Sequence, residues 1–410
     1  MRYTRFTFLT LAFIVYSVIS TYGQTSIGSA ETAGFSSARL ERYTHFLSTE
    51  IDEGRIPGAV TMVIRKGQLV HQETLGYSSL ADKKPMQQDQ LFYIQSMTKP
   101  IVTVAFMMLY EEGHFFLTDP VSKYIPAFKD LKVAKDVEAG AEGETDTVIT
   151  DITIAHILSH TAGFSHGLGG SKLDQETARA LYYKPHDNIE SRVNALLSMP
   201  LIGQPGEQWY YSASPDVLAL LIEIFSGMPT DEFLQKRLFD PLGMKDTGYN
   251  VSKEKQDRAV SLHNISDEGK LVNSEYQTKL DGYTVSGGTH GLFSTAADYM
   301  TFCQMLLNEG EWNGTRYLSR KTIELMTRNH VGNLISGGQG FGLGFGVLTD
   351  LVKNEAIGSA GQYYWSGAYC TYFFIDPKEE LISLMMTQVA PYSNYYGDKM
   401  RQFVYQAIDD

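Results

Sequence analysis

Strand-like segments lie at both ends of this 410-residue chain, and this arrangement restricts its fold more than any other feature. Residues 59–65 and 68–74 are two apolar runs joined at Lys66-Gly67, which is typical of a β-hairpin. Residues 343–348, 369–375 and 381–386 are again strand-like, and residues 376–379 supply a turn between the last two. We therefore expect one sheet that draws its strands from both ends and has the middle of the chain inserted in it.

The middle of the chain is mostly helical in pattern. Helical periodicity covers residues 37–54, 101–113, 154–160, 190–199, 216–225, 230–238, 296–309 and 396–408. Residues 129–150 are polar and acidic, which predicts an exposed excursion. The predicted organisation is a linker over 24–35, an α/β part over about 36–115 and 335–410, and a helical part over about 116–334.

The first 23 residues have the pattern of a signal peptide. Arg2 and Arg5 form a charged start, residues 6–19 form an apolar run, and residues 20–23 offer small side chains before a cut. The alternative is an uncleaved membrane anchor, but the apolar run is short for a spanning helix. The sequence therefore predicts a bacterial protein exported to the periplasm or the medium, without a stable membrane span after cleavage.

Net charge and cysteine content place only weak limits on the function. The net charge of −13 and the lack of a basic patch argue against nucleic acid as a partner. The two cysteines, Cys303 and Cys370, fall in a helical and a strand-like pattern. A disulfide is possible in an exported protein, but two buried free thiols are the preferred interpretation. The sequence indicates no oligomeric state.

The segment around Ser96 carries the strongest chemical signal. A short apolar run ends at Ser96, the helical pattern follows, and Lys99 lies one turn further on the same side. This is the S-x-x-K spacing of serine enzymes that place a lysine beside the nucleophile. A lysine can take the serine proton if burial or another cation lowers its pKa. The alternative is a helix-capping serine with a surface lysine.

Two later segments could complete such a site. Tyr211 follows the loop 205–210, and its phenol could act as a general acid or base beside the Lys99 cation. Residues 363–368 lead into a strand, where small residues allow a ligand to approach backbone N–H groups. Such an N–H could form an oxyanion hole with that of Ser96. Taken alone, each segment is better explained by ordinary packing, since the chain has 25 tyrosines and a glycine in a strand is common.

The ordered set of segments resembles the serine β-lactamase and penicillin-binding-protein superfamily, in particular the class C-like branch that includes the family VIII carboxylesterases. The resemblance covers nearly all of the chain after residue 36, and it rests on residues 96–100, 112–124, 158–164, 205–212, 241–244, 286–295 and 371–377. It implies an α+β fold, with an antiparallel sheet flanked by helices, an inserted mostly helical domain, and an active site in the cleft between them.

The resemblance also implies roles for individual residues. Ser96 would be the acylated nucleophile, Lys99 its proton acceptor or the partner of the base, and Tyr211 the family's tyrosine base. The segment Trp365, Ser366 and Gly367 takes the place of the Lys-Thr-Gly motif that binds substrate. The N–H of Ala368 would join that of Ser96 in the oxyanion hole. No cofactor and no metal are implied.

Two departures from the β-lactamase pattern bear on the substrate. Ala213 stands where the Tyr-x-Asn motif has Asn, and Trp365 stands where Lys-Thr-Gly has Lys. A substrate carboxylate would lose its cationic partner, at a cost of about 1–3 kcal/mol or more. We therefore expect a small uncharged ester, or a lactone or amide, as substrate. The alternatives are a β-lactamase or a D-amino-acid-specific peptidase, and a catalytically silent binding scaffold.

Other motifs compete for the chemistry. Residues 163–167 satisfy G-x-S-x-G with Ser165 at its centre, but that motif needs a strand before it and a helix after it. Here a helical pattern precedes and a glycine-rich loop follows, so we do not expect Ser165 to be the nucleophile. His156, His160 and His166 have a spacing that suggests metal ligands, but no H-E-x-x-H is present. Four aromatics could wall an acyl pocket or simply pack the core, namely Trp209, Tyr210, Tyr363 and Tyr364.

Overall fold

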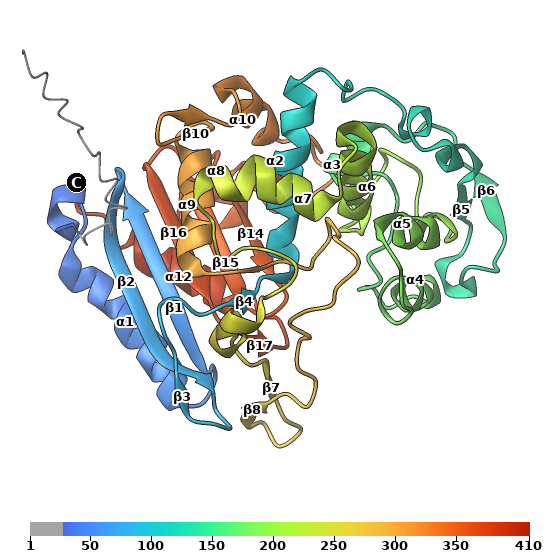
Figure 1. The fold of residues 1–410 in the computed structure, drawn as a ribbon. Helices are drawn as coiled ribbons and strands as arrows, with labels where there is room; N and C mark the ends of the chain where they lie inside the picture. The colour runs from blue at the N-terminus through green and yellow to red at the C-terminus, as the bar shows by residue number, and fades with distance from the viewer. Residues whose placement is uncertain (1–27) are drawn as a thin grey trace, which may run out of the picture.

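The protein is built around an eight-stranded sheet. The computed structural model describes residues 28–410, and its central strands follow the order β12-β13-β14-β15-β16-β1-β2-β3 (Figure 1). Neighbouring strands are antiparallel. The strands are β1 (Gly58–Arg65), β2 (Gln68–Ser79), β3 (Lys84–Pro85), β12 (Gln339–Phe341), β13 (Gly346–Leu348), β14 (Tyr363–Gly367), β15 (Thr371–Asp376) and β16 (Leu381–Met386). Because β1 pairs with both β2 and β16, the two ends of the chain share one sheet, as predicted.

Helices cover both faces of this sheet. On one face lie α1 (Ser37–Asp52) and α12 (Tyr395–Tyr405), and on the other lie α2 (Thr98–Glu111) and α9 (Ala296–Leu307) (Figure 1). Every residue of β1 is buried, which is expected of a strand covered on both sides. The predicted α+β fold is confirmed.

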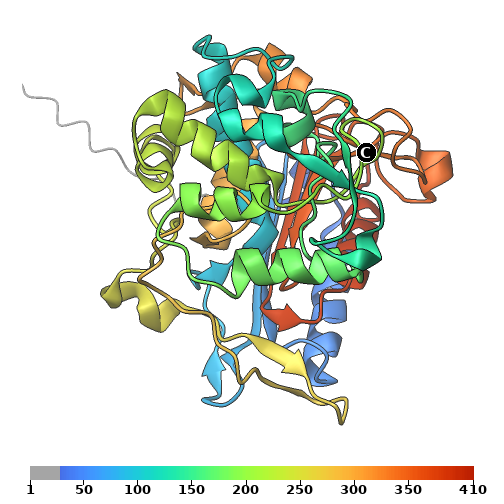
Figure 2. The same cartoon turned by 90° about the vertical axis from the view of Figure 1, so that its right-hand side faces the viewer.

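The inserted part is helical, and its helix α6 packs against α2. In Figure 2 this part lies in front of the sheet. Its helices are α3 (Ile154–Leu158), α4 (Lys172–Tyr182), α5 (Ile189–Leu197), α6 (Ser214–Ser226), α7 (Thr230–Leu234), a π-helix (Gln235–Phe239), α8 (Asp240–Leu242) and, near its end, α10 (Arg320–Met326). Short strands outside the central sheet form small sheets of their own: β5 (Lys132–Ala134) with β6 (Thr145–Thr147), β4 (Phe92–Tyr93) with β9 (Phe293–Ser294), β10 (Glu311–Trp312) with β11 (Thr315–Arg316), and β17 (Val389–Ala390) with β7 (His263–Ile265) and β8 (Leu271–Asn273).

The structure differs from the sequence-based prediction in three places. Helix α9 lies within the predicted helical part, yet it packs on the sheet against β1, β15 and β16. Residues 363–367, which we placed at the start of the next strand, form a strand of their own, β14. A turn that contains Cys370 in the left-handed conformation (φ 62°) separates β14 from β15. At the N-terminus, Phe35 of the predicted linker is 1% exposed and packs on the domain.

Further predictions concern the first residues, the cysteines and membrane spans. The predicted signal peptide, residues 1–23, lies outside the described residues. Cys303 and Cys370 are both buried free thiols, as preferred from the sequence. Among residues 28–410, we find no helix with the length and apolar character needed to cross a membrane.

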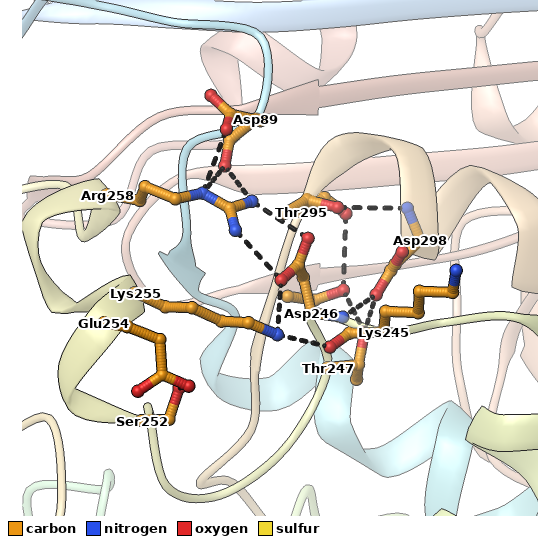
Figure 3. Close-up of polar contacts among 11 residues, drawn as sticks. Asp89, Lys245, Asp246, Thr247, Ser252, Glu254, Lys255, Arg258, Thr295 and Asp298 are labelled. Atoms are coloured by element: carbon orange, nitrogen blue, oxygen red, sulfur yellow. Dashed lines mark hydrogen bonds and ion pairs between the residues drawn. The ribbon is translucent and has the colours of Figure 1, made fainter. Parts of the chain in front are cut away.

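A polar cluster fixes the start of α9 (Figure 3). Thr295 caps the helix by accepting the N–H of Asp298. The Asp298 carboxylate accepts the N–H of Asp246 at 2.7 Å and the hydroxyl of Thr247 at 2.9 Å. Arg258 pairs with the Asp246 carboxylate at 2.9 Å. Burial raises the pKa of Asp298 from 3.8 to about 6. The cluster therefore holds a carboxyl group whose charge opposes folding.

Candidate active site

Ser96 lies where the chain enters the buried helix α2. It is part of a 3-10 turn (Gln95–Met97) that runs directly into Thr98, and Lys99 follows one turn later. Gln95 has φ 48°, a left-handed conformation that costs a residue with a side chain about 1–2 kcal/mol. The helix ends just before Gly113, as predicted. Ser96 is partly exposed whereas Lys99 is 1% exposed, so the hydroxyl faces the cleft above a buried amine.

The Lys99 amine has four close neighbours. Its Nζ donates to the carbonyl oxygen of Thr289 at 2.8 Å and lies 3.2 Å from the Ser96 Oγ. It also lies 3.4 Å from the His166 Nε2 and 4.5 Å from the centroid of the Tyr211 ring. The structure thus brings together Ser96, Lys99 and Tyr211, which the sequence predicted as one site.

Burial sets the charge of this lysine. Desolvation holds the pKa of Lys99 well below its usual value, Arg192 lowers this pKa further, and Asp216 opposes both. Arg192 and Asp216 form a buried ion pair at 2.8 Å, and Asp216 also accepts the N–H of Thr289 at 2.9 Å. The pair therefore holds the loop whose carbonyl binds Lys99. A neutral amine at Lys99 is the form that can accept a proton from Ser96.

Tyr211 reaches the site from the loop that precedes α6. Burial raises the pKa of its phenol, whereas the nearby Ser96 hydroxyl and Trp365 indole lower this pKa by favouring the phenolate. The Tyr211 hydroxyl is buried, and it makes no hydrogen bond of good geometry within the part of the chain that the structure describes, residues 28–410. At neutral pH the phenol is protonated, and its O–H is free to contact a ligand.

Strand β14 brings the Trp365-Ser366-Gly367 segment beside Ser96. A Cβ at Gly367 would overlap the carbonyl oxygen of Ile94, two residues before the serine, so only glycine allows this approach. Within residues 28–410, no hydrogen bond uses the N–H of Ala368, which leaves this predicted oxyanion-hole donor unpaired. The Ser366 hydroxyl lies 2.8 Å from that of Tyr392.

Aromatic side chains wall the cleft around Tyr211. The Trp365 ring lies 5.3 Å from that of Tyr211 and 5.2 Å from that of Phe341, and Trp209 lies 5.6 Å from Phe341. Among residues 28–410, neither buried indole N–H makes a hydrogen bond of good geometry. A hollow of about 220 Å³ borders the site at Trp365. Trp209 therefore lies beside the site, and Tyr364 lines the adjoining hollow. The other two aromatics considered from the sequence have different partners: Tyr210 donates to Gln208, and the Tyr363 ring packs against Phe345.

The competing serine has a structural role. Ser165 follows α3 through a loop, so no strand precedes it as a nucleophile elbow requires. Its hydroxyl donates to Asp174 and accepts the N–H of Gly167 at 2.8 Å. Ser165 therefore holds its own loop against α4.

A cleft of about 350 Å³ beside α7 contains neither Ser96 nor Lys99 in its lining, so it is separate from this site.

The three histidines whose spacing suggested metal ligands each have a different protein partner, and that of His166 is Lys99, as described above. His156 accepts the N–H of Thr153 in a capping box, and the His160 Nδ1 lies 2.9 Å from the Ser212 Oγ. Within the described residues, 28–410, no group of His, Cys, Asp and Glu side chains is arranged to hold a metal ion.

Sequence reasoning missed three residues of the site: His166, Thr289 and Phe341. Each lies far from Ser96 in the sequence, and no short motif links them to it. The one available signal was the pair of glycines before Thr289, because a Cβ at Gly288 would overlap the carbonyl oxygen of Pro215 at the start of α6. Close backbone packing of this kind marks where the loop must pass.

Comparisons with known proteins agree with this geometry. The sequence pattern of the family described as Beta-lactamase matches residues 42–405. An esterase, EstB of Burkholderia gladioli, is 28% identical over an alignment of 364 positions, which covers 82% of this chain and 87% of that protein. The lovastatin esterase of Penicillium rubens is 30% identical over 367 residues, covering 81% and 88%. The structure of EstCE1, a hydrolase with promiscuous acyltransferase activity, superimposes with a TM-score of 0.78 at 26% identity, covering 90% of this chain and 99% of that one.

The fold and the site define a serine hydrolase of the β-lactamase/transpeptidase-like class. The chain belongs to the β-lactamase family, in its class C-like branch, and its relatives include esterases.

Proposed function

We propose that this protein hydrolyses esters through an acyl-enzyme at Ser96. The observation that carries the proposal is the buried Lys99 amine, 3.2 Å from the Ser96 Oγ, in a site that lowers its pKa. The Ser96 Oγ attacks the ester carbonyl carbon while its proton passes to Lys99. The carbonyl oxygen becomes an anion, and we assign its stabilisation to the N–H groups of Ser96 and Ala368.

The second half of the reaction uses the same groups. When the tetrahedral intermediate collapses, the C–O bond to the alcohol breaks and the alkoxide takes a proton. We assign this proton to the Tyr211 hydroxyl, which is protonated because burial raises its pKa, and Lys99, whose Nζ lies 4.5 Å from the centre of that ring, returns the proton to it. Water then attacks the carbonyl carbon of acyl-Ser96 and gives a proton to the Lys99/Tyr211 pair. The bond from this carbon to the Ser96 Oγ breaks, the Oγ takes that proton back, and the acid is released. No cofactor takes part in this scheme.

The substrate class follows from the wall of the cleft. Trp365 presents an indole, rather than a cation, where β-lactamases hold the substrate carboxylate, and Ala213 offers no carboxamide. The rings of Trp365, Trp209 and Phe341 make the entrance of the cleft aromatic and apolar. Such a surface favours an uncharged acyl ester over an anionic β-lactam or a D-alanyl peptide. The named esterase relatives support this choice.

We further propose that the enzyme acts outside the cytoplasm. The support is the N-terminal pattern of Arg2, Arg5 and the apolar run 6–19. Fractionation of cells that express the full chain, with the N-terminus of the exported form sequenced, tests this. A protein that stays in the cytoplasm with Met1 or Arg2 at its start would contradict it.

The function is tested by intact mass after incubation with a fluorophosphonate probe, on wild type, Ser96→Ala and Ser165→Ala. We expect one label on wild type and on Ser165→Ala, and none on Ser96→Ala. The variants that are labelled should also hydrolyse a short-chain p-nitrophenyl ester, and Ser96→Ala should not. Nitrocefin and a D-alanyl-D-alanine peptide should be turned over at least about a hundredfold less efficiently than the ester. Labelling that disappears only in Ser165→Ala would overturn the site.

A second candidate activity is that of a peptidase. A relative of Salmonella typhi named "Putative D-alanyl-D-alanine carboxypeptidase" is 26% identical over an alignment of 424 positions, which covers 94% of this chain and 91% of that protein. Release of D-alanine faster than hydrolysis of the ester would favour it.

A further inference from the structure

A histidine that has no place in the scheme above contacts its central base. His166 lies in the loop between α3 and α4, 8% exposed, with its Nε2 3.4 Å from the Lys99 Nζ. Its Nδ1 lies 3.2 Å from the hydroxyl of Tyr182, the last residue of α4. Its ring stacks on that of Tyr211 at a centroid distance of 5.1 Å. His166 is thus held on three sides by groups of the site.

The contacts fix which nitrogen of His166 carries the proton. Burial and the nearby Lys99 hold the pKa of His166 well below its usual value, so the ring is neutral, with one donor and one acceptor. A lysine cation only donates, so the Nε2 must accept from Lys99 whenever Lys99 is charged. The Nδ1 therefore carries the hydrogen and donates it to the Tyr182 oxygen.

The same contacts orient the neutral form of Lys99. A neutral amine has two N–H groups and one lone pair. Two acceptors other than the nucleophile surround the Nζ, namely the Thr289 carbonyl oxygen at 2.8 Å and the His166 Nε2 at 3.4 Å. With both N–H groups donated to these acceptors, the lone pair is left for the third neighbour, the Ser96 Oγ at 3.2 Å.

We propose that His166 is a positioning residue, which turns the lone pair of neutral Lys99 toward the Ser96 hydroxyl. This proposal rests on the proposed function. The step that it serves is the passage of the Ser96 proton to Nζ as the Oγ–carbon bond forms. An acceptor at this place also stabilises charged Lys99, so its removal favours the neutral amine. In this role His166 acts only through Lys99, whose Nζ lies 3.4 Å from its Nε2, and it forms no bond with the substrate.

Two sets of groups bear on the pH dependence. Those that face the imidazole come from α2, α4, the loops before α6 and β9, and the turn after α3; they are Lys99, Tyr182, Tyr211, His290 and His160. Those that act on the charge of Lys99 besides His166 are Arg192 and Asp216, which the test leaves unchanged. The pH dependence expected below is therefore that of Lys99.

The test compares His166→Leu, which removes the acceptor, with His166→Gln, whose amide oxygen can replace it. We measure kcat and KM for a p-nitrophenyl ester across pH, with thermal unfolding as a check of folding. His166→Leu is expected to lower kcat/KM about tenfold or more at its plateau, mainly through kcat, and to move the acid limb to lower pH. His166→Gln is expected to keep the limb at the wild-type pH and to recover most of kcat.

His71→Leu is the matched control, because His71 is an equally buried imidazole, 7% exposed, which packs against Tyr43 and not against Lys99. It is expected to leave both the limb and kcat at wild-type values. A His166→Leu enzyme with a lower plateau but an unmoved limb, or with unchanged kinetics, would overturn the proposal.

If His166→Leu fails to fold, Tyr182→Phe decides, since it removes the acceptor for the Nδ1–H. A smaller shift of the limb in the same direction supports the proposal, and a wild-type profile overturns it. Fluorophosphonate labelling of wild type keeps the two ideas apart. An unlabelled Ser96 means that the proposed function itself has failed, whereas labelling with a wild-type profile in the variants removes only the role of His166.

Discussion

The buried ion pair between Arg192 and Asp216 offers the sharpest test of how this site is held. The two side chains are 8% and 1% exposed and meet at 2.8 Å. Removing one partner leaves a buried charge unpaired, which typically costs about 3–5 kcal/mol of unfolding free energy. For a chain of this length, the loss corresponds to a fall in Tm of about 4–6 °C. We expect Asp216→Asn and Arg192→Met each to show it.

The double variant separates charge from packing. Asp216→Asn together with Arg192→Met removes both charges, retains most of the side-chain volume, and keeps an amide oxygen for the N–H of Thr289. Its cost should therefore be well below the sum of the single costs, by about 2 kcal/mol or more. Chemical denaturation of the four proteins gives this coupling free energy. Single costs below about 1 kcal/mol, or costs that simply add, would refute the view that the pair is a buried charge unit.

The two single variants should shift the pH dependence of activity in opposite directions. Arg192 lowers the pKa of Lys99 and Asp216 raises it. Since catalysis needs the neutral amine, the acid limb of kcat/KM should move to higher pH in Arg192→Met and to lower pH in Asp216→Asn. The double variant should lie between them. Limbs that move together would show that the loop at Thr289, rather than charge, dominates the effect of the pair.

Three further changes have defined outcomes. Trp365→Lys, which places a cation in the apolar wall, should raise nitrocefin turnover relative to ester turnover about tenfold to a hundredfold, and an unchanged ratio would contradict our account of the substrate. Gly367→Ala should cost about 1–3 kcal/mol of stability and about tenfold or more in kcat, because its Cβ would displace Ile94 just before Ser96; wild-type activity in a folded variant would contradict this. The raised pKa of Asp298, about 6, means that its contribution to stability is present below about pH 4 and lost as pH rises through 6 (Figure 3). Asp298→Asn keeps an acceptor and should raise Tm by a few degrees at about pH 8 with a much smaller effect near pH 4, as differential scanning calorimetry would show.

Local sequence patterns predicted the helices, the β1–β2 hairpin and the spacing of Ser96 and Lys99, because these depend on residues close by in the sequence. Tyr211 and Trp365 needed the order of segments along the whole chain. His166 and Thr289 could not be found, since their contact with Lys99 depends on how two distant loops cross α2.

Strand β14 was misplaced for a different reason. Three of its five residues are half-buried, so no alternation of apolar and polar side chains separates it from the turn that follows. Its separate existence depends on pairing with β13 and β15.

The pairing of β1 with β16 has a consequence for how the enzyme comes to be active. Val60 and Met386 are partners in this ladder, yet nearly the whole chain lies between them. Contacts so distant in sequence form slowly, because a long loop must close before they contribute. During synthesis, Ser96 and Lys99 emerge early, but β14, which carries the facing wall of the cleft, emerges only near the end. The nascent chain therefore has its nucleophile long before it has a complete site in which a substrate could acylate that nucleophile.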